Sequence, residues 1–277
     1  MAVNLRAETL TFLRTVWGRA YPRVVGMQRE KSWMLFDVFL PLLQVAAYVY
    51  IYRAIGAPPE FTGFVVLGGA MTAYWMNILW SMASQLYWEK ETGNLELFII
   101  APTSRMAILL GMAVGGIFAT TIRALGVLLA GILVFRVPMA PTSVPALIGV
   151  FLLTLVALYG MGMLMASLFL LWGRQAWHIA NLFQEPVFLV SGFYFPVRAL
   201  GFLVALGASI VPITLGLDAM RQLLYPQMME GFRFLPVGVE LGALAVLGVG
   251  FLFFAHRALR FFENLARREG RLTLRGQ

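Results

Sequence analysis

Two charged side chains inside long apolar stretches have the clearest potential for chemistry. Arg123 lies between Met106 and Phe135 with no other charged residue, and Glu185 precedes Pro186 in another apolar stretch. A guanidinium in hydrocarbon costs about 2.5–3.5 kcal/mol on translocon scales, so it requires a partner or a wet cavity. Arg123 therefore pairs with Glu185 or with backbone carbonyls, or faces a cavity where it attracts an anionic group, or lies at a wet outer-leaflet site. Glu185 can supply a polar group where Pro186 interrupts the backbone hydrogen bonds of a helix.

The usual hydrolytic and metal-binding patterns are missing. The sequence contains no His-Glu-x-x-His, no Gly-x-Ser-x-Gly and only two histidines. Asp37 and Asp218 cannot form an intramembrane aspartyl pair, because the predicted topology places them at opposite membrane faces. We therefore expect no catalytic residue, no metal site and no cofactor bound by this chain.

Composition defines the setting in which these residues act. Of the 277 residues, 60% are hydrophobic and only 12% are charged, with no cysteine. The mean hydropathy is +0.81. A soluble domain needs far more polar surface, so the chain is predicted to be a polytopic membrane protein. The net charge of +8 does not indicate nucleic-acid binding, because most arginines flank apolar segments.

The apolar segments predict an all-α integral membrane protein with six transmembrane helices. A spanning helix needs about 20 apolar residues, and the predicted spans are 32–53, 63–87, 105–135, 144–172, 175–195 and 236–258. The segment 196–235 includes 19 uncharged residues, 199–217, broken by Gly201, Gly207 and Pro212. We interpret it as a re-entrant outer hairpin and loop between spans five and six. The whole chain, 1–277, is then one transmembrane domain.

The distribution of basic residues sets the orientation. Fifteen basic residues fall on the side of both termini and five on the other side. The positive-inside rule places both termini, including the tail 259–277, in the cytoplasm of a cell-membrane (inner-membrane) protein. No cleavable signal peptide is expected, since residues 1–31 lack a continuous apolar core.

The segment 1–31 predicts a basic amphipathic helix at the cytoplasmic interface. One side of its helical wheel is apolar, whereas Arg14, Arg19 and Arg23 fall on the other side. Such a helix lies in the membrane interface, and Pro22 should kink it or end its first half. It is either a passive anchor or a lever moved by an intracellular partner.

The loop 88–104 is acidic at its entrance and apolar beyond. Gly93 can end one helix in the left-handed conformation, and Asn94 can cap the next. Pro102 would stop that helix about two turns later. A short transverse helix with an apolar face of Leu97, Phe98 and Ile100 results. It is either an interfacial turn or a docking element.

Three motifs in this order resemble ATP-binding-cassette (ABC) exporter permeases of type 2. The run Glu89-Lys-Glu-Thr-Gly-Asn-Leu-Glu-Leu-Phe98, followed by Pro102, is similar to the family's intracellular coupling loop. Ser191-Gly-Phe-Tyr-Phe195-Pro196 is similar to the signature at the outer end of span five. Asp218-Ala-Met-Arg221 is similar to the motif after the re-entrant hairpin. The resemblance extends over essentially the whole chain.

The resemblance implies a permease subunit that works with separate nucleotide-binding ATPase subunits. No Gly-Lys pair occurs in the sequence, so ATP and magnesium are expected on that partner. A second permease chain, identical or homologous, and membrane lipids complete the expected partners; nucleic acid is not one. The residues expected to couple the chain to the ATPase are Glu89, Glu91, Gly93, Glu96, Phe98, Pro102, Arg14 and Arg19. The expected outer gate comprises Ser191, Gly192, Phe195, Pro196, Asp218 and Arg221.

A translocation path at the seam between two permease chains is the remaining expectation. Its candidate residues are Arg123, Glu185, Tyr74, Trp75, Asn77, Trp177, Asn181 and Gln184. The alternative for the aromatic ones is simple packing. The cargo is expected to be hydrophobic or amphipathic, such as a drug, a lipid or a lipid-linked glycan. The competing interpretation is an ATP-independent secondary transporter or channel, although the two halves show no convincing internal repeat.

Overall fold

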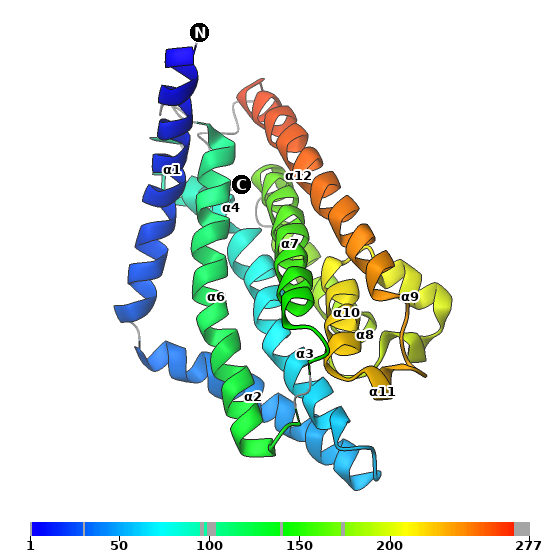
Figure 1. Cartoon of the computed structure of the whole chain (residues 1–277). Coiled ribbons are helices and arrows are strands. Elements are labelled where there is room, and N and C mark those ends of the chain that lie inside the picture. The colour runs from blue at the N-terminus through cyan, green and yellow to red at the C-terminus, as the bar shows by residue number, and fades with distance from the viewer. Residues whose placement is uncertain are drawn as a thin grey trace.

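A computed structural model describes residues 2–29, 31–94, 97–98, 104–138, 141–172 and 175–268. Within these ranges the chain is helical, with no β-strand (Figure 1). The long helices are α1 (Ala2–Arg29), α2 (Lys31–Ala54), α3 (Glu60–Asn77), α6 (Arg105–Phe135), α7 (Val144–Trp172), α8 (Gln175–Val190) and α12 (Val237–Arg268). The short helices are α4 (Gln85–Glu91), α9 (Phe202–Ala208), α10 (Pro212–Leu224) and α11 (Pro226–Met229), together with a π-helical turn, Ile78–Met82, and a 3₁₀ turn, Val197–Leu200.

The prediction of an all-α membrane protein is confirmed. Five described helical segments are long and apolar enough to cross a membrane: Leu35–Ala54, Glu60–Glu91, Arg105–Phe135, Val144–Phe169 and Val237–Phe261. The pair α9 and α10 adds a sixth if it counts as one broken span, and it bends by 115°. A bend of this kind belongs either to a broken span or to a re-entrant loop. α8 has only 16 residues and gives way to a turn at Ser191.

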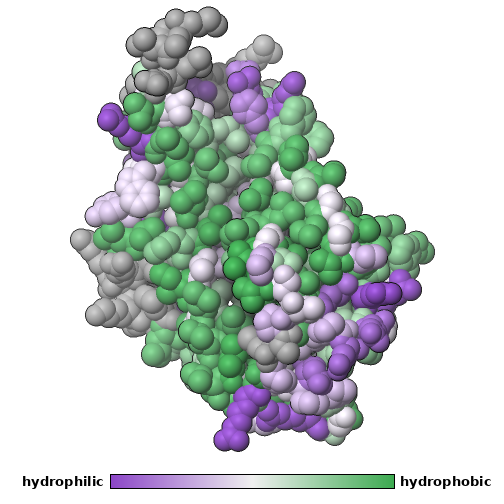
Figure 2. All heavy atoms as spheres, viewed as in Figure 1, coloured by the Kyte–Doolittle hydropathy of each residue, from purple (hydrophilic) through white to green (hydrophobic). Residues whose placement is uncertain are grey.

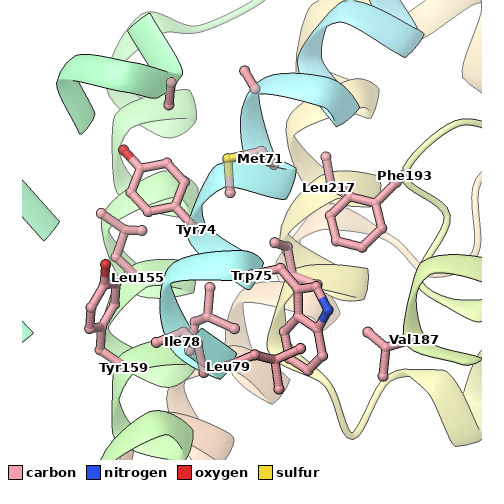
Figure 3. Packing of buried hydrophobic residues seen from close by; sticks show 14 of the residues in the cluster. Met71, Tyr74, Trp75, Ile78, Leu79, Leu155, Tyr159, Val187, Phe193 and Leu217 are labelled. Atoms are coloured by element: carbon pink, nitrogen blue, oxygen red, sulfur yellow. The ribbon is translucent and has the colours of Figure 1, made fainter. Parts of the chain in front are cut away.

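α3 is the central helix of the bundle. It packs against α2, α6 and α10 (Figure 1), and nearly all of its side chains are buried. Trp75 of α3 lies beside Phe193 and Leu217 in the cluster shown in Figure 3. Gly68 allows this packing, because a methyl group there would overlap the carbonyl oxygen of Phe193. α3 thus joins the turn that contains Phe193 to the rest of the bundle.

The face of the molecule shown in Figure 2 is largely apolar. Figure 2 shows hydrophobic side chains across the middle of one face, with hydrophilic side chains gathered toward its upper and lower-right ends. Large apolar residues of α2, such as Phe36, Phe39 and Leu43, are exposed. This distribution is expected for a protein whose middle contacts lipid or another apolar partner.

α1 runs alongside α6 and continues through Pro22 (Figure 1). The backbones of the two helices approach closely at Gly111 and Gly115 of α6. A methyl group at Gly111 would lie 2.6 Å from the carbonyl oxygen of Val16, and one at Gly115 would lie 3.0 Å from that of Ala20. Small residues four positions apart commonly allow such contacts between membrane helices.

This contact divides the predicted apolar face of α1. Ala20 is buried against α6, whereas Leu13, Trp17 and Tyr21 remain exposed. Arg19 is turned toward the protein. The apolar side chains of α1 therefore lie on two surfaces: some pack against α6, and the others are exposed.

Candidate functional site

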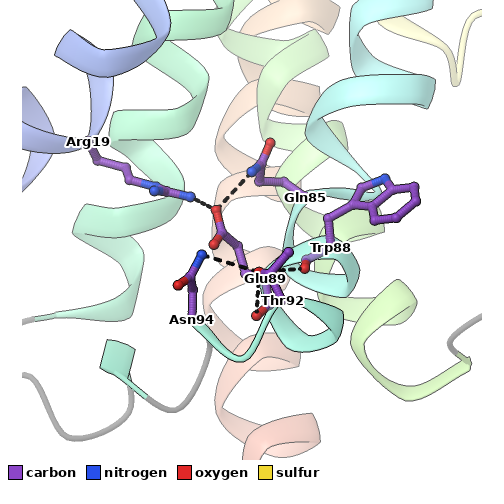
Figure 4. A network of polar contacts seen from close by, with 6 residues as sticks. All are labelled: Arg19, Gln85, Trp88, Glu89, Thr92 and Asn94. Carbon is purple, nitrogen blue, oxygen red and sulfur yellow. Dashed lines mark hydrogen bonds and ion pairs between the residues drawn. The ribbon is translucent and has the colours of Figure 1, made fainter. Parts of the chain in front are cut away.

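The predicted coupling loop begins with an ion pair to α1 (Figure 4). Glu89 of α4 is buried and bonds Arg19. Gln85, one turn earlier, donates its amide to Glu89 Oε1 at 2.9 Å. Burial lowers the pKa of the Arg19 guanidinium, although an arginine remains charged at neutral pH. Two expected coupling residues, Arg19 and Glu89, thus hold α1 and α4 together.

The end of α4 is closed by local hydrogen bonds. Thr92 Oγ1 donates to the carbonyl oxygen of Trp88 at 3.0 Å, and Asn94 Nδ2 donates to Thr92 Oγ1 at 3.2 Å (Figure 4). Gly93 has a φ of +80°, the left-handed conformation predicted for it. These hydrogen bonds and the conformation of Gly93 therefore fix the turn that follows α4 within the coupling loop.

The two apolar residues of the loop face different surroundings. Phe98 is half-buried, and its ring lies 4.8 Å from the Arg19 guanidinium carbon. Leu97 is 59% exposed. The sequence favoured Phe98 as the docking side chain, whereas the structure leaves Leu97 free for that purpose. Glu96, Ile100 and Pro102 lie outside the described residues.

Two further expected coupling residues lie on α1 and α4. Arg14 is exposed on α1, more than one turn before Arg19. Glu91 is half-buried at the end of α4.

Arg123 has a different partner from the one suggested by the sequence. Its Nε lies 3.0 Å from Asp37 Oδ2 on α2. Pairing of Arg123 with Glu185 is therefore wrong, because Asp37 is the carboxylate within ion-pair distance of Arg123. Glu185 instead accepts a hydrogen bond from Gln184 Nε2 at 3.1 Å.

Three candidate path residues of the second span lie inside the bundle. Trp75 is packed in the core. Tyr74 and Thr121 bond through their hydroxyl groups at 2.8 Å, and Tyr159 donates to Asn77 Oδ1 at 2.9 Å. Tyr74 also borders an apolar cavity of about 260 Å³ between α3, α6 and α7. Packing thus accounts for Trp75 and Asn77 within one chain.

A larger cavity of about 530 Å³ lies between α2, α3 and α8. It brings Gln184 and Glu185 together with Gln44 and Tyr48 of α2, among apolar side chains. Trp80 Nε1 donates to Gln184 Oε1 at 2.9 Å and orients it. The cavity therefore combines an apolar wall with amide, phenol and carboxylate groups.

Sequence reasoning selected Gln184 and Glu185 as path residues but missed Gln44 and Tyr48, which line the same cavity. Gln44 is the one amide within the apolar stretch 38–52, and this isolation was the available signal. Asn181 is exposed on α8. The side chain of Trp177 is outside the described part.

The two outer motifs meet at Arg221. Its side chain is 2% exposed. Its guanidinium donates to the carbonyl oxygens of Gly192, of Phe193 at 2.7 Å and of Phe64 at 3.0 Å, and stacks 3.3 Å from the Phe64 ring centre. Charge-assisted bonds of this kind are stronger than neutral ones. Arg221 thus fixes the turn after α8 onto α3.

The other outer-motif residues complete this joint. Gly192 has a φ of +72°, and a Cβ there would crowd Phe195 and Val197. Ser191 is buried, and Pro196 ends the turn in extended backbone before the 3₁₀ turn. Asp218, one turn before Arg221, is also buried. The two motifs are therefore parts of one structure.

The model of the family described as ABC-2 type transporter matches residues 20–225. No curated protein and no solved structure matches the chain. The match extends from α1 through α10 and thus includes the coupling loop, the larger cavity and the outer joint.

Proposed function

The chain belongs to the ABC-2 type transporter family, and from this premise we propose that it is the transmembrane subunit of an ATP-driven exporter. A separate nucleotide-binding subunit would bind and hydrolyse ATP with magnesium. The permease would alternate between inward-open and outward-open states and move its cargo out of the cytoplasm. It would lie in the cell membrane with both termini in the cytoplasm.

The cavity between α2, α3 and α8 carries this proposal. It lies beside exposed apolar side chains of both outer helices, such as Phe39 of α2 and Leu189 of α8. Such a surface suits a second permease chain, which would close the cavity from the opposite side. The resulting path would be lined by Gln44, Gln184 and Glu185 among apolar groups.

This lining supports a hydrophobic or amphipathic cargo. Its apolar walls can receive an acyl chain or an aromatic ring, and its few polar groups can orient a head group. A drug, a lipid and a lipid-linked glycan all fit that description. Glu185 would favour a cargo that carries a hydrogen-bond donor or a positive charge.

Coupling to the ATPase would pass through the α4 loop. Leu97 offers an exposed apolar side chain, and Glu89 connects the base of that loop to α1 through Arg19. A push on the loop would therefore reach α1 and, through their close contact, α6. This connection favours the interpretation of α1 as a lever.

The test is the ATPase activity of the assembled complex in proteoliposomes. Leu97→Asp places a charge in the docking surface and should reduce cargo-stimulated ATPase activity at least tenfold without changing the thermal stability of the permease. Leu97→Met keeps an apolar side chain at this position, so it is the matched control and should retain activity. Transport by the chain alone along an ion gradient, without ATP, would favour a secondary transporter and overturn the proposal.

A further inference from the structure

Two buried carboxyl groups meet where the outer hairpin contacts the last long helix. Asp218 lies on α10 and is 3% exposed, and Glu240 lies in the first turn of α12 and is 0% exposed. Their carboxyl groups lie close enough together to accept from one amide nitrogen. Gln222 of α10 lies beside both. The arrangement is separate from the larger cavity and from the coupling loop.

The hydrogen bonds of this cluster do not balance if both carboxyl groups are ionised. Gln222 Nε2 lies 2.8 Å from Asp218 Oδ2, 2.7 Å from the carbonyl oxygen of Leu235 and 3.2 Å from Glu240 Oε2. An amide nitrogen has only two hydrogens for these three acceptors. Glu240 Oε1 is buried with no hydrogen-bond partner among the described residues. The cluster therefore lacks donors.

Charge leads to the same conclusion. Two adjacent carboxylates out of water repel each other strongly, and sharing one proton relieves that repulsion. The helices packed against α10 are α3, α7, α11 and α12. Arg221 is the charged group of the described residues that faces Asp218 besides Glu240, and Tyr52 and Tyr225 face Arg221 in turn. Arg221 offsets one negative charge, and a second remains.

We propose that Asp218 and Glu240 form a proton-binding site, in which one proton held between the two carboxyl groups fastens the outer hairpin to α12. Asp218 is the anionic member, since it accepts the backbone N–H of Phe234 at 3.0 Å and faces Arg221. Glu240 carries the proton and donates it to Asp218. The N-terminal end of α12 favours an anion at Glu240, but that partial charge is smaller than the full charge of Asp218.

The proton makes the contact between α10 and α12 sensitive to pH. With the proton in place, Glu240 donates a hydrogen bond and the missing donor is supplied. When alkaline pH removes it, two buried negative charges face each other across the contact between α10 and α12. The hairpin should then separate from α12, so stability is present at low and neutral pH and is lost as the pH rises.

The test combines infrared spectroscopy with thermal unfolding of the purified full chain between pH 5 and pH 10. The wild type should show the carbonyl band of a buried protonated carboxyl group at neutral pH, shifted in D₂O, and its unfolding midpoint should fall by several degrees toward pH 10. Glu240→Gln keeps a donor for Asp218 without a removable proton. This variant should lose the band, and its unfolding midpoint should not fall between neutral pH and pH 10.

Two further variants keep the proposal falsifiable. Glu230→Gln, at an exposed carboxylate of the preceding loop, is the matched control and should behave like the wild type. Asp218→Asn should also abolish the alkaline loss, because Glu240 alone then ionises without a facing anion. Absence of the band from the wild type, or the same alkaline loss in Glu240→Gln, would overturn the proposal. Stabilisation by sodium but not by choline, in a protein without the band, would replace the proton by a metal cation and also overturn it.

Discussion

The pair of Arg123 and Asp37 offers a quantitative test of how the membrane helices are held together. Its Nε–Oδ2 distance is 3.0 Å, and the two side chains are 34% and 32% exposed. Fully exposed ion pairs contribute about 0.2–1 kcal/mol, and breaking a fully buried pair costs about 3–5 kcal/mol. Since one-third of each side chain is exposed, between apolar helices, we expect a coupling free energy of about 1–3 kcal/mol.

A double-mutant cycle measures this coupling directly. Arg123→Gln and Asp37→Asn should each lower the unfolding midpoint in detergent, and the double variant should lose less than the sum. A free energy of 1 kcal/mol corresponds to about 2–4 °C for chains of 150–250 residues, so the difference is measurable. Additive losses from Arg123→Gln and Asp37→Asn would refute the pair.

Glu185 supplies the control for this cycle. It lies on α8 and is hydrogen-bonded to Gln184, so Glu185→Gln and Arg123→Gln should add to within about 0.5 kcal/mol. Coupling of Arg123 to Glu185 and none to Asp37 would reverse our assignment.

Two further predictions concern the packing at Gly68 and the topology of the chain. Gly68→Ala should destabilise the chain by at least about 1–3 kcal/mol, because its methyl group overlaps the carbonyl oxygen of Phe193; Gly149→Ala, where a Cβ meets nothing within 4 Å, should be neutral or slightly stabilising in the same thermal assay. For topology, single cysteines at the exposed residues Arg136 and Glu230 should react with an impermeant thiol reagent added outside cells, and one at Asn94 should react only after permeabilisation. Labelling of all three from outside would reject the proposed orientation. Asp218 is unsuitable for this assay because its side chain is buried.

The fold class was accessible from the sequence because composition alone determines it. Apolar stretches of about 20 residues can satisfy their backbone groups in a membrane only as helices, whatever their neighbours. The bend in the hairpin was similarly accessible, since Gly207 and Pro212 interrupt its apolar run.

The side-chain partners were not accessible in the same way. The partner of Arg123 depends on which face of α6 meets α2, and several carboxylates were available in the sequence. The inward position of Phe98 depends on the docking of Arg19, which comes from a distant segment. One missed signal was present: Gly111 and Gly115 are spaced as in closely packed membrane helices, and they mark where α1 rests.

The close contact of α1 with α6 also has a consequence for the synthesis of the protein. Val16 and Ala20 emerge from the ribosome long before Gly111 and Gly115, against which they rest. At about 5–20 residues per second, α1 must wait several seconds for its binding surface, while two intervening helices enter the membrane. During that interval its exposed Leu13, Trp17 and Tyr21 can hold it at the lipid surface. We therefore expect these exposed side chains to keep the first helix beside the membrane until its partner helix arrives.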